Sequence, residues 1–114
     1  MRIALVQLAI VALALVPRAL TAQAPASQVV ILENPSVRVT VTTLAPGIGS
    51  GRHQGIEAEV GIVAEGDVTL ESPLGRTELR PGTAYWLPGL TPHDTRNEGQ
   101  RPARIYEIFL KRCD

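Results

Sequence analysis

The sequence predicts one all-β domain, a small antiparallel barrel or sandwich, preceded by a short N-terminal targeting segment. The 114-residue length suffices for a single domain. All 10 glycines and eight of the nine prolines lie in residues 23–114, so no interval between them favours a long amphipathic helix. Short apolar runs separated by turn-forming residues recur throughout the same part of the chain. Strands at this spacing are typical of sandwiches and barrels.

Residues 1–22 are interpreted as a signal peptide. Met1 and Arg2 give a positive start, and Ile3 to Val16 is apolar except for Gln7. As a helix this run of 14 residues would be about 21 Å long, shorter than a hydrocarbon core of about 30 Å. A short membrane anchor is the alternative, but the small residues up to Ala22 favour cleavage there and a secreted or periplasmic product that starts at Gln23.

Residues 23–28 (QAPASQ) are predicted to be a disordered leader, and residues 29–112 the domain. Expected strands are, in order, 29–32, 37–42, 59–64, 68–71, 77–79, 84–87 and 103–110, with turns at 72–76 and 97–99. In the second strand, valines at 37, 39 and 41 alternate with polar residues, the period of a half-buried strand.

The last expected strand is largely apolar on both faces. Ile105, Glu107 and Phe109 face one way, and Tyr106, Ile108 and Leu110 face the other. A barrel of this size has only one interior, so the second apolar face predicts a buried contact with another molecule, most simply a homodimer. Scattered surface hydrophobics that need no partner are the alternative.

Charge and cysteine content exclude several classes of protein. The chain has 11 basic and 11 acidic side chains, of which nine and 11 remain in residues 23–114. This balance predicts no nucleic-acid binding driven by charge and, once the signal is removed, no association with a membrane surface. A single cysteine, Cys113, excludes a disulfide scaffold; it is either an inert tail thiol or one half of a disulfide between two chains.

The two histidines, His53 and His93, lie in two separate segments of the predicted barrel. Imidazole and carboxylate groups on neighbouring strands can converge on one cation, and two histidines with one carboxylate are the usual ligands of non-haem iron. Structural histidines held by ordinary hydrogen bonds remain the alternative.

Both segments resemble the paired motifs of the cupin superfamily. In the first, His53, Glu59 and Gly66 fall at the places of the first histidine, the glutamate and the closing glycine. The second motif is represented by a matching series of residues at the family's spacing, namely Gly82, Pro88, His93 and Asn97. The stretches 33–39 and 44–47 also resemble the opening of small single-domain cupins, including a group linked to β-alanine catabolism.

This resemblance implies a jelly-roll barrel that holds a divalent metal, such as iron, manganese, nickel or zinc, through His53, Glu59 and His93. The chain departs from the pattern at Gly55, the usual place of a second histidine, and at Leu90, the usual place of a glycine. Glu57 lies two residues before Glu59 and is a candidate fourth ligand, as is Gln54. Loss of the metal is the alternative that this vacancy leaves open.

Two adjacent aromatic residues, Tyr85 and Trp86, precede Pro88, and strand alternation should send one inward to line a ligand pocket. Two functions stay open at this point. One is a metal-dependent cupin enzyme, an oxygenase, isomerase or lyase acting on a small molecule. The other is a non-catalytic cupin that binds a small ligand after losing its metal, since fold does not imply function.

Overall fold

The computed structural model describes residues 25–112. It contains eight strands, β1 (Ala26–Glu33), β2 (Val37–Leu44), β3 (Ala58–Glu65), β4 (Val68–Ser72), β5 (Gly75–Leu79), β6 (Ala84–Leu87), β7 (Asp94–Asn97) and β8 (Ala103–Leu110). The predicted signal peptide, the start at Gln23 and Cys113 lie outside the described residues. Between residues 25 and 112 there is no helix of the length and apolarity needed to cross a membrane.

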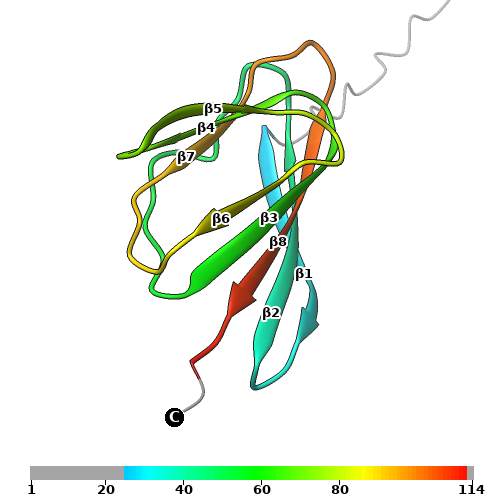
Figure 1. The fold of residues 1–114 in the computed structure, drawn as a ribbon. Helices are drawn as coiled ribbons and strands as arrows, with labels where there is room; N and C mark the ends of the chain where they lie inside the picture. Colours follow the sequence, from blue (N-terminus) through cyan, green and yellow to red (C-terminus); the bar gives the residue numbers. More distant parts are fainter. Residues whose placement is uncertain (1–24, 113–114) are drawn as a thin grey trace, which may run out of the picture.

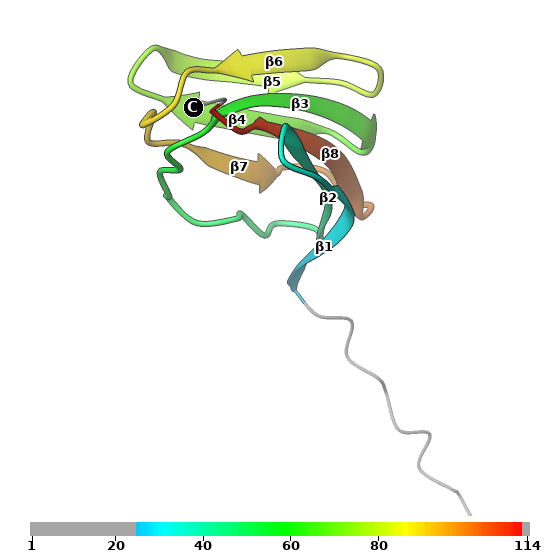
Figure 2. The same ribbon diagram turned by 90° about the horizontal axis from the view of Figure 1, so that it is seen from below.

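The strands form two antiparallel sheets that face each other in a jelly-roll arrangement (Figure 1). The larger sheet has the order β1-β2-β8-β3-β6, and the smaller has the order β5-β4-β7. Seen from below, the strands curve around a common interior, with β1 at the edge of the larger sheet (Figure 2). The predicted all-β jelly-roll domain is therefore confirmed.

The interior is apolar at one end and polar at the other. The register pairs Leu44 with Ala103 and Val63 with Ile105, and all four side chains are fully buried. The remaining members of this buried apolar cluster are Val68, Leu70, Leu79, Tyr85 and Leu87. Two residues beyond Ile105, the inner face of β8 carries Glu107, which pairs with Gly61 of β3. Two residues beyond Gly61, the inner face of β3 carries Glu59, so this end of the interior is polar. The apolar end holds the two sheets together and leaves the polar end for chemistry.

The first strand is longer than predicted, and the predicted disordered leader was wrong for its last residues. β1 begins at Ala26, and Ala26 to Gln28 pair with Leu44 to Thr42 of β2. The Gln28 side chain also reaches the hydroxyls of Thr40 and Thr42, at 3.4 Å each. The polar composition of these residues predicted a disordered leader. They form a strand instead, because their backbone pairs with β2, and the side-chain pattern alone does not reveal such pairing.

Strand β7 was not predicted, because Asp94 to Asn97 contains no apolar residue. Its order comes from pairing with β4 and from burial of Thr95 and Asn97 on its inner face. The turn predicted at 72–76 is shorter than expected, because β4 and β5 pair up to Ser72 and Gly75 and leave a two-residue turn. Gly75 takes a φ of +116° there, a conformation that favours glycine.

Candidate metal and ligand site

The two histidines lie side by side because the chain segment before β3 pairs with the segment before β7. His53 and His93 are bridge partners, and each backbone N–H donates to the carbonyl of the other at 2.9 Å. Their ring centroids are 4.2 Å apart at an interplanar angle of 60°. The structure thus brings together two residues that are 40 positions apart in the sequence.

Both imidazoles are oriented in the same way by the backbone. Nδ1 of His53 lies 2.8 Å from the Gly51 carbonyl oxygen, and Nδ1 of His93 lies 2.9 Å from the Thr91 carbonyl oxygen. A carbonyl only accepts hydrogen bonds, so each Nδ1 carries the proton and each neutral ring keeps its lone pair on Nε2. This is the arrangement through which proteins orient imidazole ligands.

Glu59 lies on the inner face of β3, only 3% exposed, and contacts two other site residues. Its Oε1 accepts a hydrogen bond of 2.8 Å from the Tyr85 hydroxyl, and its Oε2 lies 3.4 Å from Nε2 of His93. Burial raises the pKa of the Glu59 carboxyl and lowers the pKa of the His93 imidazole. Both shifts favour the neutral forms of these two groups.

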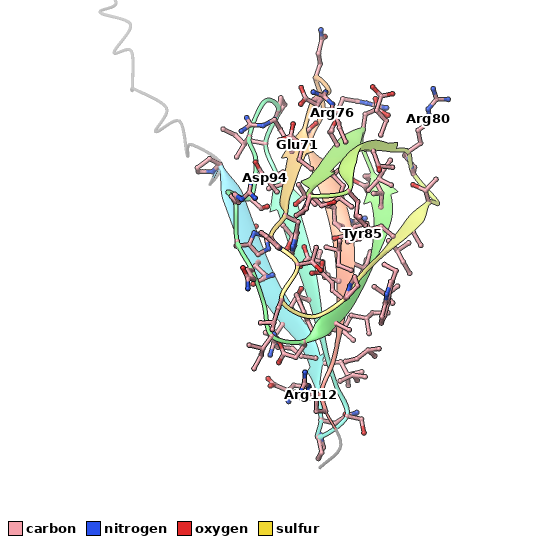
Figure 3. All side chains as sticks on the ribbon, turned by 60° about the vertical axis from the view of Figure 1, so that its left-hand side comes forward. Glu71, Arg76, Arg80, Tyr85, Asp94 and Arg112 are labelled. Atoms are coloured by element: carbon pink, nitrogen blue, oxygen red, sulfur yellow. The ribbon has the colours of Figure 1, made fainter. Side chains whose placement is uncertain are left out.

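Tyr85 is the inward member of the two aromatic residues, and Trp86, 55% exposed, points to the outer face of the larger sheet. Figure 3 shows Tyr85 within the barrel. The ring packs directly over Gly61, because an added Cβ at that glycine would lie 2.0 Å from Tyr85 Cζ. Burial and the neighbouring Glu59 raise the pKa of the tyrosine, so its hydroxyl stays protonated and donates.

A second buried acid, Glu107, was not predicted as a site residue. It lies on the inner face of β8, 6% exposed, and its Oε2 accepts a 3.3 Å hydrogen bond from Gln28 Nε2. Burial raises the pKa of this carboxyl, and the nearby Glu59 carboxylate raises it further. The signal was present in the sequence, since Glu107 shares a strand face with Ile105.

Neither predicted fourth ligand lies with the histidines. Glu57 lies in a bend just before β3, and both of its carboxylate oxygens accept hydrogen bonds of 3.4 Å from the Arg38 guanidinium. That guanidinium also stacks over the Phe109 ring, 4.6 Å from its centroid. Gln54 is exposed. At Gly55, an added Cβ would meet no atom within 4 Å, so the usual place of the second histidine is open.

The remaining motif residues have structural roles. Asn97, fully buried, donates to the carbonyls of Leu44 and Arg101 and accepts from the Gly99 N–H, so it fixes the turn after β7. Asp94 lies on the outer side of β7, near Ser50 and Arg96 (Figure 3). Leu90 has a φ of +64°, the left-handed conformation that explains why a glycine suits this place in the motif.

A pocket of about 320 Å³ opens beside His53, between β1 and the segment that carries this histidine. The residues that line it are Ala26, Ser27, Gln28, Thr42, Ser50, His53 and Glu107. Among residues 25–112, no arginine or lysine lines this pocket.

The donor set has the chemistry of a divalent-metal site, with two neutral imidazoles and a carboxylate at the same end of the barrel. Across the described part of the chain, no three His, Cys, Asp or Glu side chains are already close enough together to hold an ion. Metal binding would therefore require these side chains to turn toward a common point.

Comparisons with known proteins agree with this architecture. The profile of the Cupin domain family matches residues 40–109. A cupin domain from Bordetella pertussis Tohama I is 28% identical, with a TM-score of 0.67, over 76% of this chain and 94% of that one. A protein of Thermus thermophilus is 24% identical, with a TM-score of 0.70, over 77% and 85% of the two chains. KdgF from Halomonas sp. is 19% identical, with a TM-score of 0.68, over 79% and 84%.

No curated protein matches the sequence. The family profile nevertheless spans more than half of the chain and includes both histidine segments, and the structural matches reproduce the same barrel. The chain belongs to the Cupin domain family.

Proposed function

We propose that this protein is a metal-dependent cupin that binds a divalent ion through His53, Glu59 and His93 and acts on a small polar molecule. The observation that carries the proposal is the matched orientation of the two imidazoles. Each Nδ1 is tied to a backbone carbonyl two residues earlier, at 2.8 and 2.9 Å, which leaves both Nε2 lone pairs available as ligands.

The remaining site residues have defined tasks in this proposal. The Tyr85 hydroxyl holds Glu59 Oε1, which directs the other carboxylate oxygen toward His93. Gln28, Thr42 and Ser50 offer hydrogen bonds to a polar ligand in the adjoining pocket. A bound divalent ion would polarise an oxygen of that ligand as a Lewis acid. This chemistry suits an isomerase, a lyase or an oxygenase.

Metal analysis of the tag-free protein, purified from its own compartment, tests this proposal. Stoichiometric iron, manganese, nickel or zinc is the expected result. Titration of the stripped protein should then show binding that His93→Ala abolishes. Asp94→Asn is the matched control, because Asp94 is adjacent in sequence but lies on the outer side of β7. A folded wild type that binds none of these metals would instead favour a metal-free ligand-binding cupin.

We further propose that the protein acts as a homodimer. Apolar side chains cross the outer face of the larger sheet in one register row, through Val39, Ile108, Val60 and Trp86. Trp86 is 55% exposed and Ile62, on the same face, is 37% exposed. An apolar face of this extent is typical of a protein contact, and a second copy offers a matching face.

Export is the last part of the proposal. The apolar segment 1–22 supports secretion with cleavage after Ala22. Intact-mass measurement of the exported protein should give a chain that starts at Gln23. A product that retains Met1 would contradict this.

A further inference from the structure

Glu107 is a buried acid that, within residues 25–112, has no arginine or lysine partner. It is 6% exposed. The side chains that hydrogen-bond to its carboxyl, Gln28 and Thr42, are both neutral. A carboxylate in such a place is costly unless a positive charge is bound nearby.

The position of Glu107 brings it to the same end of the barrel as the histidines. On β8 it is the register partner of Gly61, while Glu59 is two residues away on the same face of β3. Diagonal neighbours of this kind have Cα atoms about 7–8 Å apart, within joint reach of two glutamate side chains. Glu107 and His53 also line one pocket. The Tyr85 ring packs over Gly61, and its hydroxyl donates to the Oε1 oxygen of Glu59.

The first cupin motif lacks a metal ligand at Gly55, the usual place of its second histidine. Of the two residues that the sequence offered as replacements, Glu57 is bound by Arg38, and Gln54 is exposed. Glu107 is therefore the one further acid among residues 25–112 that is buried and faces the interior with Glu59 and His93.

We propose that Glu107, on the last strand, is the fourth protein ligand of the metal, in place of the histidine that the first motif lacks at Gly55. This inference rests on the proposed function. The protein would then offer two imidazoles and two carboxylates, a set that neutralises the charge of a divalent ion. Gln28 is a positioning residue, because its hydrogen bond holds one oxygen of Glu107. Carboxylate oxygen suits manganese better than imidazole does, whereas imidazole suits nickel.

The test compares binding of Mn(II) and Ni(II) to stripped, tag-free protein by calorimetry. Glu107→Gln should weaken Mn(II) binding by at least about tenfold, the scale on which even outer partners act, and should weaken Ni(II) binding less. Glu57→Gln is the matched control, because it makes the same change in an acid that contacts Arg38 outside the site. It should leave both affinities unchanged.

A rescue variant separates ligation from a general charge effect. Gly55→His is sterically open, since an added Cβ at Gly55 meets nothing within 4 Å and its backbone φ lies outside the positive range. In the Glu107→Gln background it should restore Ni(II) affinity more fully than Mn(II) affinity. The visible spectrum of bound Co(II) should change with Glu107→Gln and stay unchanged with Glu57→Gln.

Three results would overturn the inference. If Glu107→Gln binds both metals like the wild type while His93→Ala does not bind, Glu107 is no ligand and the proposed function stands. If Glu107→Gln weakens binding but leaves the Co(II) spectrum unchanged, Glu107 acts through charge alone. If the folded wild type binds no metal, the inference fails together with the proposed function.

Discussion

Replacement of Gly61 by alanine should unfold the site end of the barrel, because Tyr85 occupies the space where a Cβ would be. That Cβ would lie 2.0 Å from Tyr85 Cζ and 2.4 Å from its hydroxyl oxygen. Contacts this short cannot be relieved by a small shift, so the buried ring must leave its position. Alanine is otherwise favoured over glycine in a strand, so any loss of stability must come from the displaced tyrosine.

The expected loss has two parts. Overpacking in a filled interior costs about 1–3 kcal/mol. Loss of the 2.8 Å hydrogen bond from Tyr85 to the buried Glu59 carboxyl costs about 1.5–3 kcal/mol more. Together these give about 2.5–6 kcal/mol, which is a fall in melting temperature of at least about 10 °C for a domain of this size.

Thermal melts of three further variants make the result decisive. Tyr85→Phe should cost about 1.5–3 kcal/mol, because it removes only the hydrogen bond. In a Tyr85→Leu background, adding Gly61→Ala should cost less than about 1 kcal/mol, because the ring is gone. If Gly61→Ala alone melts within about 4 °C of the wild type, the proposed packing of Tyr85 over Gly61 is wrong. The double variant keeps the test valid even if Gly61→Ala does not fold.

Three other predictions follow from single features. Leu90→Gly should raise the free energy of unfolding by up to about 1 kcal/mol, because the φ of +64° at Leu90 disfavours a side chain. Thermal melts measure this change, and a lower melting temperature of the variant would contradict the prediction. In metal-free protein, Glu107→Gln should stabilise the fold more at pH 7 than at pH 4. Burial raises the pKa of Glu107 in the folded protein above its usual value of 4.5. The protonated Glu107 side chain therefore contributes to stability below pH 4.5, and this contribution is lost as the pH rises through the raised pKa. Melts of both proteins at the two pH values check the sign. Trp86→Glu should convert the proposed dimer into a monomer, since Trp86 lies 55% exposed on the outer face; an unchanged mass in light scattering would exclude this face as the interface.

Most of the fold could be predicted from hydrophobic alternation and turn residues. The strands at 84–87 and 103–110 were predicted with their observed bounds. The polar strand β7 and the first residues of β1 escaped prediction for one shared reason. Their order comes from hydrogen bonding to neighbouring strands, which leaves no mark on the local hydrophobic pattern.

The three residues of the proposed metal site were chosen because the family motifs fix their spacing. The proposal of Glu57 as a fourth ligand rested on an extended strand before Glu59. The chain instead bends at 56–57, and the guanidinium of Arg38 binds the carboxylate of Glu57. Alternation predicts which side chains share a face only as far as the strand itself extends.

Glu107 illustrates the opposite difficulty, since its face was assigned correctly and its importance was still missed. Both faces of β8 are largely apolar, so the sequence alone does not say which one lines the interior. The register decides this, because it pairs Glu107 with Gly61 and Ile105 with the fully buried Val63. Once that face is known to be internal, an acid on it has only two physical outcomes in a small barrel. It binds its proton and remains neutral, or it meets a cation.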